Sequence, residues 1–245
     1  DVIRDYEIIQ HEPESSQMAE IGRTGKGVEV LVNKKVLEAD VRVALTTAHF
    51  DGLSGYWTSK DLILPGISAK KSVIGDLSLY LEGKSAAGVR EGNPVYEDRK
   101  EAMDMARIDL SVEWVLEGDK VISFGGGRPE DMEAKSVRCV DEVYRREVEE
   151  EADICVVSAG GYPFDETFYH ACESLERASL VTKEGGVIVA LAQCREGYGP
   201  DDFFRWMEKF KSSKSVASAL TKMPSVGGFM AYRLRKVLER NRVYV

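Results

Sequence analysis

The sequence has no apolar run long enough to span a membrane and no excess of basic residues. A membrane-spanning helix needs about 20 consecutive apolar residues. The formal net charge is −9, whereas a protein that neutralises nucleic-acid phosphates or acidic lipids needs a basic surface. We therefore expect neither a nucleic-acid partner nor a membrane partner.

Several short motifs are also missing. The sequence has no Gly-x-Ser-x-Gly and no Gly-x-Gly-x-x-Gly, which disfavours a common type of hydrolase and a dinucleotide-dependent dehydrogenase. No two cysteines have Cys-x-x-Cys spacing, because the four lie far apart at Cys139, Cys155, Cys172 and Cys194. Cys155 and Cys172 have apolar neighbours. This pattern indicates buried, reduced thiols, and hence a cytoplasmic protein.

No signal peptide opens the sequence, and the first residue is Asp1 rather than Met. The last residues, 243–245, read as part of a strand. Both ends therefore suggest a trimmed form of a longer protein. The 245 residues, 43% of them hydrophobic, are enough for one or two domains with a sizeable core.

The second half of the chain alternates strands and helices. Residues 152–158 and 186–192 are nearly continuous apolar runs, which is typical of parallel strands buried on both faces. A third strand is expected at 242–245. The predicted helices cover 165–178, 201–210, 215–223 and 228–239. Strand–helix–strand order predicts a parallel sheet flanked by helices, with ligands at the carboxyl ends of the strands.

The first half is less regular. Period-two alternation predicts strands at 109–116 and 120–124, and Glu117-Gly-Asp119 between them is typical of a hairpin. Other predicted strands are 29–32 and 41–45, and the predicted helices are 34–39, 70–81, 93–106 and about 129–151. The expected fold class is α/β: two α/β domains, 1–135 and 136–245, with mainly parallel sheets flanked by helices and an interdomain cleft.

A turn-rich loop, residues 49–66, follows the strand at 41–45. It contains His49, Gly52, Gly55 and Lys60. Histidine exchanges a proton near neutral pH, glycine lets the backbone approach a ligand, and lysine binds anions or acts as a nucleophile when desolvated. A polar surface loop with one chance histidine is an equally good reading of these residues alone.

The loop resembles the central signature of the lactate racemase family, approximately His-x-x-x-Gly-Tyr-Ser-Gly-Gly-x-Lys-Ser-x-Leu-Pro-Gly. His49 matches the histidine, Gly52-Leu-Ser-Gly55 matches Gly-Tyr-Ser-Gly, and Leu64-Pro-Gly66 matches the end. Four other segments also resemble family landmarks, in family order: 36–40 before the loop, and 91–95, 159–165 and 183–188 after it. The chain is thus identified as a member of this family, and members usually extend further on both sides.

The resemblance implies a racemase or epimerase of a 2-hydroxy acid that works by hydride transfer to and from a nickel-pincer nucleotide. His49 would be the catalytic acid/base, and Lys60 would carry the cofactor covalently. Counting back from Pro65-Gly66 without gaps places Asp61 at the lysine position instead. The implied cofactor contacts are Gly52, Ser54, Gly55, Gly160 and Gly161. The implied partners are a small organic acid and the enzymes that make the cofactor.

Substrate contacts are implied at Tyr162, Asp165, His170, Glu173 and Phe229. Each of three has a structural alternative: Asp165 as a helix cap, His170 as an ordinary helix residue, and Phe229 as a core aromatic. Glu173 stands where similar racemases carry a lysine suited to a carboxylate substrate. Because a glutamate repels such a substrate, a substrate other than simple lactate is expected.

The metal position also departs from the family. Asp76 stands roughly where the family has a nickel-ligating histidine, and a carboxylate is a harder, weaker ligand for nickel than imidazole. Either Asp76 or water completes the nickel site, or this member binds no nickel. The alternative function is therefore a non-catalytic family member that binds a nucleotide or a small organic acid.

Overall fold

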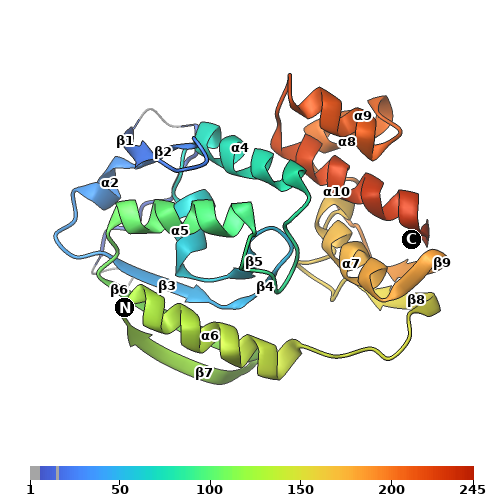
Figure 1. Ribbon diagram of the computed structural model, residues 1–245, viewed down its shortest axis with the longest axis horizontal. Helices are drawn as coiled ribbons and strands as arrows, with labels where there is room; N and C mark the ends of the chain where they lie inside the picture. Colours follow the sequence, from blue (N-terminus) through green and yellow to red (C-terminus); the bar gives the residue numbers. More distant parts are fainter. Residues whose placement is uncertain (1–5, 15–16) are drawn as a thin grey trace. The chain divides into compact units, whose positions relative to one another are not determined.

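The computed structural model describes residues 6–14 and 17–245. The chain divides into two compact units, Asp1–Arg145 (unit 1) and Arg146–Val245 (unit 2). None of the helices in the described part is long and apolar enough to cross a membrane. Figure 1 shows the elements of each unit, and the two units are described separately.

The described residues of unit 1 form three small sheets. The strands are β1 (Met18–Arg23), β2 (Glu29–Asn33), β3 (Val43–Thr47), β4 (His49–Asp51), β5 (Gly55–Trp57), β6 (Leu110–Glu117) and β7 (Lys120–Gly127). β1 pairs with β2 and β4 pairs with β5, both antiparallel. The third sheet has the order β3-β6-β7, with β3 parallel and β7 antiparallel to β6. The hairpin predicted at 117–119 is thereby confirmed.

The helical segments among the described residues of unit 1 are α2 (Lys34–Leu37), α3 (Ser59–Asp61), η1 (Leu62–Gly66), α4 (Lys70–Leu79), η2 (Tyr80–Glu82), α5 (Pro94–Ala106) and α6 (Pro129–Tyr144). α5 begins at Pro94 because the Asn93 side chain accepts hydrogen bonds from the next free backbone N–H groups. The sequence predicts that α6 continues to about residue 151, but the helix ends at Tyr144. Every residue from 145 to 151 is exposed, so no apolar face remains to hold a helix there.

Two apolar clusters hold unit 1 together. The first joins β2, η1 and α5 through Val30, Val32, Ile63, Leu64, Ala102, Met103 and Ala106. The second joins the β4–β5 hairpin, β6 and α6 through Ala48, Tyr56, Val115, Val137 and Val140. The hairpin that begins at His49 is therefore packed on the sheet and helix beneath it.

Unit 2 is the predicted parallel sheet with helices. β8 (Ala152–Ser158), β9 (Thr182–Leu191) and β10 (Arg242–Tyr244) have the order β10-β9-β8, and both pairings are parallel. The helices are α7 (Phe168–Leu180), α8 (Asp201–Lys209), α9 (Ser213–Leu220) and α10 (Val226–Arg240). The α/β fold class and the three predicted strands are confirmed.

The burial of this sheet differs from the prediction. Ile154 and Val156 on β8 are exposed, Val156 by 66%, whereas Ile188 and Ala190 on β9 are buried. Successive strand residues point to opposite faces. The face of Ile188 and Ala190 is therefore buried, whereas the face of Ile154 and Val156 is exposed on β8 and only half-buried on β9. The apolar runs predicted parallel strands correctly but did not identify the covered face.

Candidate functional site

His49 starts β4 and is exposed at the end of the preceding strand. Its ring stacks on that of Trp57, its partner across the hairpin, with ring centroids 6.0 Å apart and an interplanar angle of 8°. The Nδ1 atom lies 2.9 Å from the carbonyl oxygen of Phe50. A carbonyl oxygen only accepts hydrogen bonds, so Nδ1 carries the proton in the neutral ring and Nε2 has a free lone pair. Such a ring is suited to act as a base.

The turn after β4 is fixed from within. The Asp51 carboxylate accepts hydrogen bonds from the backbone of Leu53 and Ser54, and the Ser54 hydroxyl lies 3.0 Å from it. Ser54 is fully buried, and its hydroxyl also lies 3.0 Å from the Asp61 carboxylate. Ser54 is thus engaged inside the protein, whereas the neighbouring Gly52 is half-buried.

Gly55 has a structural reason to be glycine. Its φ is +83°, and a Cβ at this position would lie 2.2 Å from the carbonyl oxygen of Val89. Its own carbonyl oxygen accepts a hydrogen bond from Gly88. The close approach therefore joins the hairpin to the loop at 86–89, so the backbone contact at this glycine is to the protein itself.

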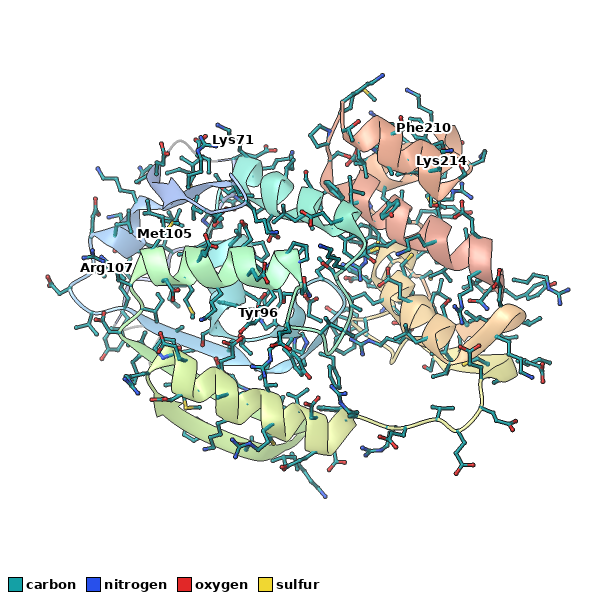
Figure 2. All side chains as sticks on the ribbon, in the orientation of Figure 1. Lys71, Tyr96, Met105, Arg107, Phe210 and Lys214 are labelled. Atoms are coloured by element: carbon teal, nitrogen blue, oxygen red, sulfur yellow. The ribbon has the colours of Figure 1, made fainter. Side chains whose placement is uncertain are left out.

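Lys60, on α3, has a completely buried side chain. Its Nζ donates to the Tyr56 carbonyl oxygen, to Thr58 Oγ1 at 3.1 Å and to Asp61 Oδ2 at 2.8 Å. Glu133 Oε1 lies 3.9 Å away. An ammonium group has three donors, and all three are used within the protein. The Tyr96 ring, labelled in Figure 2, has its centroid 5.3 Å from the same nitrogen.

Asp76, on α4, is also completely buried and is bound by Arg99 of α5. The Nε and Nη2 atoms of Arg99 both donate to its carboxylate, at distances of 2.8–3.2 Å. The remaining nitrogen, Nη1, donates to Asp61 at 2.9 Å and lies 3.7 Å from Asp51. Arg99 therefore connects the His49 hairpin, α3 and α4.

The electrostatics of this cluster follow from its burial. Burial opposes the charge on Arg99, but the carboxylates of Asp76, Asp61 and Asp51 outweigh it and raise the pKa of the guanidinium. Burial raises the pKa of Asp76 to about 6, against the opposing effect of Arg99. Arg99 is therefore positively charged at neutral pH.

Two further buried carboxylates lie near α3. Glu113, on β6, accepts hydrogen bonds from the backbone N–H and the hydroxyl of Ser59, at 3.0 and 2.7 Å. Glu133, on α6, is 3.9 Å from Lys60, and burial raises its pKa. One oxygen of each carboxylate has no hydrogen-bond partner among the described residues. The surroundings of Lys60 are therefore predominantly acidic.

Asp98, also on α5, allows the effect of burial on a carboxyl pKa to be tested. Burial raises its pKa from 3.8 to about 6. The folded state therefore binds a proton more tightly than the unfolded state, and the resulting stabilisation is present below about pH 4 and lost as the pH rises through about 6. We expect the Asp98→Asn variant to gain about 2 kcal/mol relative to wild type between about pH 4 and pH 7.

Urea unfolding at several pH values measures this difference. Glu117→Gln, at the exposed tip of the β6–β7 hairpin, is the matched control and should show the same difference from wild type at every pH. A pH-independent difference for Asp98→Asn would contradict the assigned pKa.

In unit 2, the loop after β8 is open. Gly160 and Gly161 have φ of +101° and +80°, and Tyr162 is 72% exposed. Asp165 is buried, and its carboxylate accepts a hydrogen bond from the Gln193 backbone at 3.1 Å. It therefore joins this loop to the segment after β9. Asp165 is not the cap of α7, because Thr167 occupies that position.

The other predicted substrate residues lie on α7 and α10. His170 is exposed, with its Nδ1 3.1 Å from the Thr167 hydroxyl, and Glu173 is exposed almost one turn further along. Phe229 is 2% exposed in the interior of α10. His49, Lys60 and Asp76 belong to unit 1 and these residues to unit 2, so their meeting in an interdomain cleft stays a prediction.

Sequence reasoning missed Arg99, Glu113 and Glu133. One signal was available for Arg99: it lies on the same helical face as Val95, Ala102 and Met103, all of which are buried. A charged residue on an apolar stripe is buried only when it is paired. Its partners, however, are 23 and 38 residues away in sequence, so no local pattern identifies them.

The fold defines an α/β protein, and His49, which follows the end of β3, is a candidate acid/base group. Two family models match the chain: the lactate racemase N-terminal domain over residues 1–88 and the lactate racemase C-terminal domain over residues 148–238. The chain therefore belongs to the lactate racemase family.

Individual relatives agree with this assignment. The chain is 29% identical to the lactate racemase of Thermoanaerobacterium thermosaccharolyticum over 93% of its own length and 53% of the relative's. It is 30% identical to the lactate racemase of Lactiplantibacillus plantarum over 83% and 49% of the two lengths. The chain thus spans about half the length of these curated relatives.

Two solved structures resemble this chain. The apoprotein structure of the Thermoanaerobacterium thermosaccharolyticum lactate racemase matches with a TM-score of 0.91 at 25% identity, covering 98% of this chain and 60% of that chain. A Thermotoga maritima protein matches with a TM-score of 0.69 at 15% identity, covering 93% and 61%. The second match concerns the fold alone.

Proposed function

We propose that this chain is part of a racemase or epimerase of a small 2-hydroxy acid, in which His49 is the acid/base group. The observation that carries the proposal is the hydrogen bond between His49 Nδ1 and the Phe50 carbonyl oxygen, at 2.9 Å on an exposed ring. In the neutral tautomer this hydrogen bond leaves the lone pair of Nε2 open to a ligand. Membership of the lactate racemase family supplies the reaction class.

The chemistry assigned to His49 is limited to one proton. Nε2 accepts the proton of the substrate hydroxyl group and later returns it to the same oxygen. Inversion at Cα also requires a hydride acceptor, and no residue described here is assigned that role. The stacked Trp57 ring and the Phe50 carbonyl hold the imidazole in one orientation. A fixed orientation favours catalysis because no reorganisation of the base is needed.

Glu173 supports a proposal about the substrate class. It is an exposed carboxylate on α7, and Arg177 on the same helix lies 4.0 Å away. Where related racemases use a lysine for the substrate carboxylate, this residue supplies negative charge instead. We propose a 2-hydroxy acid other than simple lactate. Its part next to Glu173 would be a neutral or positively charged group, which the glutamate carboxylate does not repel.

In the family, a nickel-pincer nucleotide supplies the hydride acceptor. The residues implied to hold it do not fit it in their present contacts: Lys60 uses all three donors inside the protein, and Asp76 is bound by Arg99. The covalent role of Lys60 stays a prediction of the resemblance, and no step is assigned to the cofactor.

The same contacts favour a second function, binding without metal chemistry. A chain with buried, internally paired Lys60 and Asp76 still presents exposed His49 and the open Gly160–Gly161 loop. Such a protein would bind a nucleotide or a small organic acid, and loss of His49 would change its affinity but no reaction rate.

Racemisation assays on a panel of single-enantiomer 2-hydroxy acids distinguish the two functions. The first function predicts that the wild-type protein, made together with the cofactor-synthesis enzymes, interconverts the enantiomers of at least one panel member and that His49→Gln lowers the rate by about 10²–10⁴-fold. His11→Gln, which affects a different histidine bonded to the Ser68 carbonyl oxygen, is the matched control and should stay within a few-fold of wild type. Binding to the wild type without interconversion would support the second function.

A further inference from the structure

We infer that an internal ionic network centred on Arg99 takes the place of the family's nickel cofactor in this chain, so that the chain carries neither a covalent adduct on Lys60 nor nickel on Asp76. The network consists of Lys60, Asp61, Asp76, Arg99 and the nearby Asp51. The inference concerns cofactor loading. Because racemisation by hydride transfer needs a hydride acceptor, a chain without the cofactor has the second proposed function, binding without metal chemistry.

Lys60 has the surroundings of a structural ion pair. Acylation of an amine requires a neutral, accessible nitrogen, and it removes the positive charge and two of the three donor hydrogens. Lys60 is 0% exposed, and its ammonium is 2.8 Å from Asp61 and 3.9 Å from Glu133. An adduct would remove one of the two cations bound to Asp61, leaving Arg99 at 2.9 Å, and would remove the cation 3.9 Å from Glu133. Loss of positive charge beside buried carboxylates is disfavoured. The contacts of Lys60 therefore oppose a covalent cofactor.

The alternative anchor and the metal ligand are both bound to Arg99. Asp61 stands at the anchor position in the ungapped comparison, and Asp76 stands near the metal-ligand position. Both carboxylates are 0% exposed and bind the same guanidinium, at 2.9 and 2.8 Å. A metal ion at Asp76 would have to displace Arg99, a cation with no neutral form at physiological pH. Arg99 therefore supplies internally the positive charge that a metal would bring.

The described residues offer no better set of metal ligands. No group of three or more histidine, cysteine, aspartate or glutamate side chains in residues 6–14 and 17–245 is arranged to hold a metal ion. Nickel prefers imidazole and sulfur ligands to carboxylates. His49, the histidine nearest the network in sequence, directs Nδ1 to the Phe50 carbonyl oxygen and stacks on Trp57.

Intact-mass and metal analysis test the inference on the full chain, produced in cells that co-express the enzymes making the nickel-pincer nucleotide. A family lactate racemase that gains the adduct in the same cells shows that the cofactor is present. We expect the chain to keep its unmodified mass of 27.3 kDa and to contain less than about 0.1 nickel per chain. An adduct that disappears in Lys60→Met, or stoichiometric nickel that disappears in Asp76→Asn, would overturn the inference.

A second measurement needs no cofactor. In the folded chain, acetic anhydride should modify Lys60 at least about 100-fold more slowly than exposed Lys120 on β7, because Lys60 is buried and ion-paired. The two lysines should react at similar rates in concentrated urea. Equal acetylation rates for Lys60 and Lys120 in the folded chain would show that the Lys60 amine is accessible, and would refute the inference. Because neither readout uses racemisation, failure of this inference is distinguishable from failure of the proposed function.

Discussion

Replacement of Arg99 by methionine is expected to lower the free energy of unfolding by about 3–5 kcal/mol. The variant keeps an unbranched side chain but removes the cation bound to Asp76 and Asp61, both of which are completely buried. A buried carboxylate without a partner must either remain charged in a poorly solvated site or take up a proton, and both cost free energy. Urea unfolding followed by circular dichroism measures the loss.

Two variants check this explanation. Arg128→Met removes an exposed arginine that is 2.9 Å from Asp131, and a surface ion pair of this kind should contribute less than about 1 kcal/mol. Combining Arg99→Met with Asp76→Leu removes a cation and an anion together and should recover part of the loss. If Arg99→Met is no more destabilising than Arg128→Met, the network does not hold the unit together.

Replacement of Gly55 by alanine is expected to cost about 2–5 kcal/mol, through two effects. The positive φ of +83° is strained for an L residue, and the added Cβ would lie 2.2 Å from the Val89 carbonyl oxygen, so that the backbone of the 86–89 loop must move. The thermal unfolding midpoint and the urea unfolding midpoint both report this change.

Gly27→Ala separates the two effects. Gly27 has a φ of +88°, but an added Cβ would meet no atom of the described residues within 4 Å, so this variant should lose only roughly 1 kcal/mol from backbone strain. The difference between the two variants measures the close approach to Val89. Equal losses would mean that the 86–89 loop moves freely, and Gly55 would then be a glycine only for its backbone angle.

The secondary structure of this chain was largely predictable because it depends on local patterns. The parallel strands of unit 2, the β6–β7 hairpin and α5 with its Asn93 cap all follow from side-chain periodicity and capping residues. Errors occurred where local patterns lack information. The charged residues at 145–151 have a composition that favours a helix, but they are exposed and do not form one. Asp165 lies near the start of α7, but Thr167 is the residue that caps this helix.

The candidate site was predictable only in part. Histidine and glycines in a loop after a strand, together with the family signature, identified the His49 hairpin. The resemblance to the family also implied that Lys60 and Ser54 contact the cofactor, and this stays a prediction. In the structure both are fully buried and bonded to Asp61. Burial depends on what packs above a loop, and the sequence of the loop does not contain that information.

The sequence by itself determined the α/β class, the order of the elements and the family, because these depend on short-range periodicity and on motifs that lie within a few residues of each other. Only the tertiary structure decided which charged groups share a site. Arg99 meets Asp76 and Asp61 across 23 and 38 residues of sequence. Ion pairs between separate elements form because packing brings their side chains together and excludes water, and no local pattern encodes that meeting.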